Sequence, residues 1–269
     1  MEYIEVRLHP LTPEMKEIIT SLLAETNFES FAGGEDELLA YVQAGLFSSE
    51  EVERICNPFG LKFTESLIPE QNWNTEWEKN FEPVLIAGRC YIRAPFHSPR
   101  PDYPYEIIIE PKMSFGTAHH ETTSMMIGMM MEMDFKGKKV LDMGSGTGIL
   151  AILARKLGAA SVDAIDNDSW AYSNALENME KNRISGVTVK MGDVDAAGSG
   201  YDILLANINR NVLIGHLPEY SKCMERGELL MSGFYEEDLP MIRQAAESNG
   251  FTFNRQVTKN RWVAAQFKK

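Results

Sequence analysis

The segment over residues 140–148, which reads VLDMGSGTG, constrains the fold more than any other part of the chain. A short apolar strand ends there in a carboxylate, and Gly144, Gly146 and Gly148 then lead into a predicted helix over residues 149–157. Glycine is required where the chain turns sharply or where another molecule must approach the backbone. The first turn of the helix adds unpaired N–H groups and a partial positive charge. The pattern therefore predicts a βα unit of an α/β fold that binds a ligand at its turn.

The spacing of the three glycines indicates which ligand this turn accepts. It is G-x-G-x-G and not the dinucleotide-binding G-x-G-x-x-G, because Ile149 stands where the third glycine belongs. S-adenosylmethionine suits this spacing better than NAD, since it is a compact nucleoside with an amino-acid tail and no pyrophosphate. We therefore predict S-adenosylmethionine as the cofactor. A glycine-rich turn with only a structural role is the alternative.

Three further predicted strands each end next to a polar residue, namely Asp166, Asp193 and Asn207. Ligands of open parallel sheets bind at the carboxyl ends of the strands. In nucleotide-binding folds a carboxylate about twenty residues beyond the glycine loop, the place that Asp166 holds, accepts hydrogen bonds from ribose hydroxyls. These strand ends favour a nucleoside site over a purely structural set of turns.

Composition agrees with a globular enzyme. The 269 residues are 44% hydrophobic, which is enough for one sizeable core and a small second domain. The first residues lack the features of a signal peptide, and no apolar run approaches the roughly 20 residues that span a bilayer, so we expect a cytoplasmic protein without membrane contact. Cys56, Cys90 and Cys223 are isolated, which predicts core residues and no disulfide framework. The five histidines have no metal-binding spacing, so no metal is expected.

The net charge of −13 is unevenly distributed. Residues 1–69 carry 13 acidic and 4 basic side chains, a net charge of −9, whereas the remaining 200 residues carry 26 and 22, a net charge of −4. An acidic surface repels phosphate backbones, so direct binding of nucleic acid is disfavoured. A basic protein partner is attracted to the N-terminal part instead. Ordinary solubility is the alternative explanation.

The first 69 residues are predicted to form a separate ferredoxin-like α+β domain. Their hydrophobic periods give the order β-α-β-β-α-β, over residues 3–8, 13–26, 28–32, 38–44, 48–56 and 61–68. Residues 70–84 are predicted to form a linker helix in which Trp73, Trp77 and Phe81 make an aromatic stripe for packing. The second domain is then expected over residues 85–269.

A polar cluster over residues 115–123, FGTAHHETT, precedes a predicted helix over residues 124–133. Small residues, hydroxyls and imidazoles before the start of a helix suit the binding of a carboxylate or another polar ligand. The helix carries six methionines, which we interpret as adaptable filling of the core.

The C-terminal part completes a predicted α/β sheet. Helices are expected over residues 211–224 and 238–249, with a strand over 228–232 between them. Residues 251–257 and 262–267 are expected to form an antiparallel pair at the edge of the sheet.

Taken together, these segments resemble the PrmA family, the methyltransferases of bacterial large-subunit ribosomal protein 11. The resemblance is carried by the N-terminal β-α-β-β-α-β unit, the linker over residues 72–81, the cluster over 115–123, and residues 142–148 with 206–208. It implies a Rossmann-like, seven-stranded class I methyltransferase domain, with the small ferredoxin-like domain recognising the substrate. It also implies a basic ribosomal protein as the substrate, and we expect the enzyme to be a monomer.

The resemblance implies that seven residues contact S-adenosylmethionine: Thr123, Gly144, Gly146, Gly148, Asp166, Asp193 and Asn207. Gly146 and Gly148 complete the loop against the methionine part, Asp166 holds the ribose, and Asp193 receives the adenine amino group. The family commonly has FGTGTHPTT where this chain has FGTAHHETT. Ala118, His119 and Glu121 therefore alter the expected shape of the target pocket.

Asn207 is also the residue to which we assign a catalytic role. Methyl transfer from a sulfonium is an in-line displacement, so the enzyme must position the acceptor, and the acceptor amine must be neutral. We hypothesise that the side-chain oxygen of Asn207 orients the N–H groups of that amine. His119 and His120 are candidates for accepting its proton, with a structural hydrogen bond as the alternative.

The sequence leaves three functions to compare. The first is a protein N-methyltransferase that acts on lysine side chains or the N-terminal amine of a large-subunit ribosomal protein. The second keeps the cofactor but methylates a glutamine of another protein or a small molecule. The third is a non-catalytic binding module or an NAD enzyme, which the G-x-G-x-G spacing and Asn207 oppose.

Overall fold

The computed structural model describes residues 2–34, 36–68, 81–112 and 115–269. The chain divides into two compact units, Met1–Asn80 and Phe81–Lys269, which are described separately below. The predicted linker helix over residues 70–84 lies outside the described residues, except for its last four positions. The domain boundaries at residues 69 and 85 stay a prediction.

The smaller unit has the predicted order of elements, which are β1 (Tyr3–Leu8), α1 (Pro13–Ala24), β2 (Phe28–Ala32), β3 (Leu38–Gln43), α2 (Ser49–Cys56) and β4 (Phe63–Ile68). The strands form one antiparallel sheet in the order β2-β3-β1-β4, which is the ferredoxin-like arrangement. Both helices begin at side-chain caps, because Thr12 accepts the N–H of Met15 and Ser48 accepts the N–H of Glu51. Their apolar faces pack on one side of the sheet, over Val6.

The larger unit contains a second set of elements. In chain order they are β5 (Val84–Ile86), β6 (Cys90–Arg93), β7 (Tyr105–Ile108), α4 (Glu121–Met130), β8 (Lys139–Met143), α5 (Ile149–Lys156), β9 (Ser161–Asp166), α6 (Ser169–Lys181), β10 (Val187–Met191), β11 (Ile203–Asn207), α7 (Arg210–Cys223), β12 (Glu228–Tyr235), α8 (Leu239–Ser248), β13 (Thr252–Lys259) and β14 (Trp262–Lys268).

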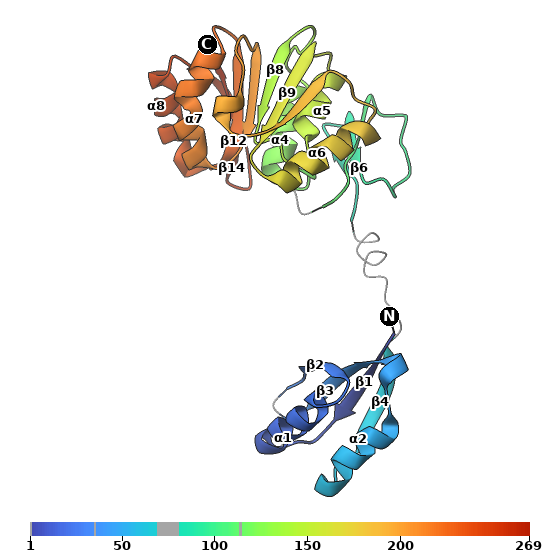
Figure 1. Cartoon of the computed structure of the whole chain (residues 1–269). Helices are drawn as coiled ribbons and strands as arrows, with labels where there is room; N and C mark the ends of the chain where they lie inside the picture. Colours follow the sequence, from blue (N-terminus) through green and yellow to red (C-terminus); the bar gives the residue numbers. More distant parts are fainter. Residues whose placement is uncertain (1, 35, 69–80, 113–114) are drawn as a thin grey trace. The chain divides into compact units, whose positions relative to one another are not determined.

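Seven of these strands form one mixed sheet in the order β10-β9-β8-β11-β12-β14-β13. The first five are parallel, and β14 is antiparallel to both of its neighbours, so the predicted closing pair is confirmed. Helices α4, α5 and α6 cover one face of the sheet and α7 and α8 cover the other (Figure 1). Parallel strands covered on both faces make the predicted α/β class, and strand order reverses between β8 and β11, where ligands of such sheets bind.

Strands β5, β6 and β7 form a separate three-stranded sheet beside α6. Asn182, just after α6, exchanges hydrogen bonds with the backbone of Ile108 at 2.8 and 2.6 Å. Asn178 accepts the N–H of Glu110 at 2.8 Å through its side-chain oxygen. Two asparagines therefore satisfy the free edge of this small sheet.

Helix α4 begins three residues earlier than the helix predicted over residues 124–133, and it also ends earlier, at Met130. His120 is extended and caps it, since Nδ1 accepts the N–H of Thr122 at 3.3 Å. Ser124 already lies in the first turn, where its N–H bonds the carbonyl of His120 at 3.1 Å. The prediction missed this start because histidine is not among the residues that usually mark an N-cap.

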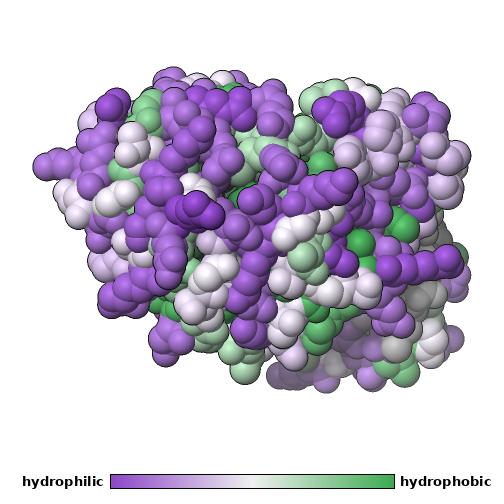
Figure 2. Space-filling view, turned by 90° about the horizontal axis from the view of Figure 1, so that it is seen from above, coloured by the Kyte–Doolittle hydropathy of each residue, from purple (hydrophilic) through white to green (hydrophobic). Residues whose placement is uncertain are grey.

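The face of the larger unit at the amino ends of the parallel strands is mostly hydrophilic, with hydrophobic residues in small separate patches (Figure 2). Among the described helices, none is long and apolar enough to cross a membrane. The three cysteines are buried core residues, as predicted.

Candidate active site

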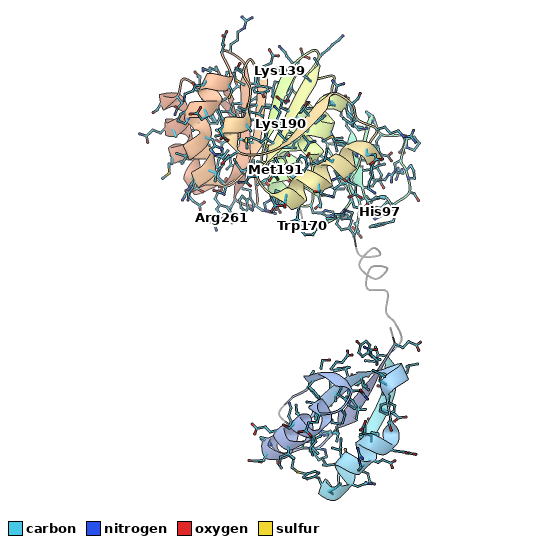
Figure 3. The ribbon with its side chains drawn as sticks, viewed as in Figure 1. His97, Lys139, Trp170, Lys190, Met191 and Arg261 are labelled. Carbon is cyan, nitrogen blue, oxygen red and sulfur yellow. The ribbon has the colours of Figure 1, made fainter. Side chains whose placement is uncertain are left out.

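A cavity of about 410 Å³ lies at the carboxyl ends of the central strands. Figure 3 shows Lys139, at the start of β8, near one edge of the larger unit, and Trp170 and Arg261 at the opposite edge, which is the edge of these carboxyl ends. Five of the seven predicted residues line the cavity, whereas Thr123 and Gly148 do not. The five are Gly144, Gly146, Asp166, Asp193 and Asn207.

The glycine loop after β8 is packed tightly by its own chain. A Cβ on Gly144 (φ 70°) would lie 2.1 Å from Cγ2 of Ile208, and one on Gly146 (φ 53°) would lie 2.3 Å from the carbonyl oxygen of Phe115. A Cβ on Gly148, which caps α5, would lie 2.8 Å from the methyl group of Met179. The loop therefore needs glycine because three other segments approach it, and Gly148 serves the packing of α5 on α6.

Asp166 connects the glycine loop to the start of α6. Its Oδ2 accepts the N–H of Gly146 at 2.8 Å, and its Oδ1 accepts the N–H of Asp168 at 3.0 Å. Each carboxylate oxygen has a further lone pair, so both remain able to accept a ligand hydroxyl. Asp166 also lines a second cavity of about 780 Å³ together with Trp170, whose side chain is 79% exposed.

Asp142, the last acidic residue before the glycines, is buried below the loop. Its Oδ2 accepts the N–H of Ala151 at 3.0 Å, while its Oδ1 has no hydrogen-bond partner among the described residues. Burial raises the pKa of Asp142 to about 7, and the bond from Ala151 offsets only part of this effect. The carboxyl group is thus poised between its neutral and charged forms near physiological pH.

Asn207 ends β11 and faces the cavity. Its Nδ2 donates to the hydroxyl oxygen of Thr123 at 3.3 Å, and Thr123 is itself buried in the first turn of α4. Its Oδ1 is buried and accepts no hydrogen bond from any described residue. A buried acceptor without a donor is unfavourable unless a ligand supplies one.

Aromatic rings form one wall of the cavity. The ring of His120 lies edge to face with Phe115 at 5.2 Å and with Trp262 at 4.8 Å between centroids. Its Nδ1 is already engaged, because it lies 2.8 Å from the hydroxyl oxygen of Thr122. The hairpin that carries Trp262 is tied to α4, since Asn260 donates to Glu121 at 2.8 Å. Glu121 is one of the residues that depart from the family pattern.

The two histidines of the 115–123 cluster have different surroundings. His120 lines the cavity, whereas His119 does not. Nε2 of His119 lies 2.9 Å from the carbonyl oxygen of Glu82, and its ring packs edge to face on Phe81 at 4.6 Å. His119 therefore contacts the first residues of the larger unit.

Two cavity residues that the sequence did not reveal are His216 and Trp262. His216 projects from α7, and its Nε2 lies 3.2 Å from Oδ1 of Asp193. Both reach the cavity from elements far from the glycine loop in sequence. Over the described ranges, no group of three or more His, Cys, Asp or Glu side chains is placed to hold a metal ion.

Comparison with known proteins agrees with this architecture. The family described as Ribosomal protein L11 methyltransferase (PrmA) matches residues 10–269. A ribosomal protein L11 methyltransferase of Phocaeicola vulgatus is 44% identical over 278 residues, which cover 99% of each chain. One of Porphyromonas gingivalis is 44% identical over 260 residues, which cover 93% of this chain and 90% of the relative.

A solved structure gives the same result. The crystal structure of ribosomal protein L11 methylase from Lactobacillus delbrueckii subsp. bulgaricus is 27% identical, with a TM-score of 0.65. It covers 70% of this chain and 98% of that chain. The seven-stranded sheet, the cavity at its switch point and the match over nearly the whole sequence lead to one conclusion: this chain belongs to the ribosomal protein L11 methyltransferase family.

Proposed function

We propose that this chain transfers methyl groups from S-adenosylmethionine to lysine side chains or the N-terminal amine of ribosomal protein L11. Membership of the family gives the reaction, S-adenosylmethionine-dependent methylation of ribosomal protein L11. The choice of an amine as acceptor is our own inference. It is carried by one observation: Asn207 lines the cavity, and its Oδ1 is buried without a donor among the described residues.

The cavity suits the cofactor in size and in chemistry. Its volume of about 410 Å³ lies within the range of roughly 300–1,000 Å³ that small-molecule sites occupy. We assign the methionine part to Gly144 and Gly146 with Gly148 supporting the loop, the ribose to Asp166, and the adenine amino group to Asp193. Thr123 acts through Asn207, whose amide it holds. When bound, S-adenosylmethionine supplies a methyl group that is activated by its sulfonium.

The residues of the chain then have three tasks. Asn207 accepts an N–H of the acceptor amine and so directs its lone pair, while the bond to Thr123 fixes the orientation of its amide. The aromatic wall around His120 offers apolar surface to an ammonium group that enters, and loss of hydration there lowers the pKa of that group and favours its neutral form. Since Nδ1 of His120 accepts the N–H of Thr122, a neutral His120 carries its proton on Nε2 and can donate it to a substrate group, while the proton released by the amine passes to solvent.

The smaller unit supplies an acidic surface for a basic substrate. On the face of its sheet opposite to Val6, Glu5 accepts a hydrogen bond from Tyr41 at 3.0 Å and Glu29 accepts one from Tyr3 at 2.8 Å. These pairs hold carboxylates on this sheet face in a segment of net charge −9, and Glu5 also lies 3.7 Å from Arg7. We propose that this unit recruits ribosomal protein L11 by charge complementarity, and that the enzyme acts as a cytoplasmic monomer.

The test is methylation of purified ribosomal protein L11 with labelled S-adenosylmethionine, followed by peptide mapping. We expect the label on lysines or the N-terminal amine. Asn207→Ala should lower kcat at saturating cofactor by about ten- to a hundred-fold, as expected for a lost bond to the reacting group. Asn211→Ala, which removes an exposed amide in α7, is the matched control and should retain activity. Label on glutamine, or full turnover by Asn207→Ala, would contradict the proposal.

A further inference from the structure

The carboxylate of Asp193 is anchored on one side only. Its Oδ1 accepts the N–H of Val194 at 2.7 Å and lies 3.2 Å from Nε2 of His216. Its Oδ2 makes no hydrogen bond to any residue in the described part of the chain. Asp193 and His216 both line the cavity, and the side chain of His216 is only 14% exposed. One oxygen thus accepts a backbone N–H and contacts His216, and the other is left for a ligand.

His216 is itself oriented from within the core. Its Nδ1 lies 3.4 Å from the hydroxyl oxygen of Tyr220, one turn further along α7, and the two rings pack edge to face at 5.8 Å. Tyr220 is fully buried, and burial raises the pKa of its phenol far above the ordinary value, so the hydroxyl keeps its proton. A phenol that donates to Nδ1 leaves the proton of a neutral imidazole on Nε2, the ring atom that lies 3.2 Å from Oδ1 of Asp193. A protonated imidazole also donates from Nε2.

We infer that His216 is a positioning residue that makes the cavity select a 6-amino purine over a 6-oxo purine. It holds Asp193 so that Oδ2 accepts a hydrogen bond from the exocyclic amino group, and this inference rests on the proposed function. A 6-oxo purine would instead bring its carbonyl oxygen against the carboxylate, and two acceptors repel each other. Val212, four residues before His216 on the same face of α7, lines the cavity and offers apolar contact to a base.

The test compares two ligands by calorimetry, S-adenosylhomocysteine and its 6-oxo analogue S-inosylhomocysteine. His216→Leu removes the donor and keeps apolar bulk, and we expect about ten-fold weaker binding of S-adenosylhomocysteine with less than two-fold change for the analogue. His216→Gln keeps an N–H donor and should retain most of the discrimination. Tyr220→Phe removes only the hydroxyl. It should also lower the preference for S-adenosylhomocysteine over S-inosylhomocysteine, but by a smaller factor than His216→Leu.

Kinetics give a second measurement that a purely structural role would not reproduce. In His216→Leu we expect KM for S-adenosylmethionine to rise by about ten-fold while kcat at saturation stays within about two-fold of the wild type. Equal loss of affinity for both homocysteine compounds would overturn the inference. Equal binding of S-adenosylhomocysteine and S-inosylhomocysteine by the wild type would also overturn the inference, although it would leave the proposed function intact. Failure of the wild type to bind S-adenosylhomocysteine at all would remove the proposed function as well.

Discussion

Replacement of Asp142 by asparagine tests whether the site contains a buried carboxyl group that resists ionisation. The side chain is 1% exposed, and its pKa is raised from 3.8 to about 7, chiefly because burial penalises the charged form. Between these two values the unfolded chain has lost the proton and the folded protein retains it. Stability must therefore fall as pH rises from about 4 to about 7, and the penalty is fully present above pH 7.

The size of the effect follows from the two pKa values. Each unit of difference corresponds to about 1.4 kcal/mol, so the folded protein is penalised by about 2 kcal/mol at pH 5 and by about 4 kcal/mol at pH 8. The side chain introduced by Asp142→Asn would not ionise, although its amide oxygen could still accept the N–H of Ala151. The advantage of Asp142→Asn over the wild type should thus grow by about 2 to 3 kcal/mol between pH 5 and pH 8. Any constant difference in packing cancels from this comparison.

The assay is urea unfolding of ligand-free protein at pH 5, 6, 7 and 8, with the free energy of unfolding of the larger unit taken from midpoint and slope. Asp195→Asn is the matched control, because Asp195 is exposed, and its difference from the wild type should not change with pH. A difference between Asp142→Asn and the wild type that stays constant from pH 5 to pH 8 would refute the reasoning from burial.

Three further substitutions test other parts of the structure. Gly144→Ala should lower the melting temperature by several degrees, since its Cβ would meet a side-chain carbon at 2.1 Å and its φ is 70°; an unchanged melting curve would contradict this packing. Thr123→Val keeps the shape but removes the partner of Asn207 Nδ2, so kcat should fall several-fold, with unchanged circular dichroism as the control. Ser48→Ala should destabilise the smaller unit by about 1 kcal/mol, because the side chain of Ser48 accepts a backbone N–H at the start of α2. Ser49→Ala is the control and should have little effect on stability. Equal effects of the two substitutions in urea unfolding would contradict the prediction.

The sequence is most informative about residues at the ends of parallel strands, whose location in a common site can be predicted. Asp166 and Asn207 could be assigned to one site because parallel strands bring their carboxyl ends to the same edge of a sheet. The same strand pattern predicts the α/β class and the closing hairpin, which the structure confirms. The glycines signal a close approach correctly, but the approaching groups at Gly144 and Gly146 are Ile208 and Phe115 of the chain itself.

Side chains that reach the cavity through tertiary packing could not be predicted in this way. His216 lies within a helix, and no local pattern distinguishes it from a surface histidine. Trp262 begins the last strand and meets His120 only because α4 packs against that strand. The early start of α4 depends on an imidazole used as a cap, which propensity rules do not anticipate.

The hydrogen bond from the Gly146 N–H to Asp166 has a consequence for how fast and how tightly a ligand is captured. Because this bond lies within the protein, the loop already has its conformation before a ligand binds. Association then loses little backbone entropy at this point, and more of the intrinsic attraction is expressed as affinity. A variant without this hydrogen bond would have to order the loop each time a ligand binds, and the association rate constant would be lower.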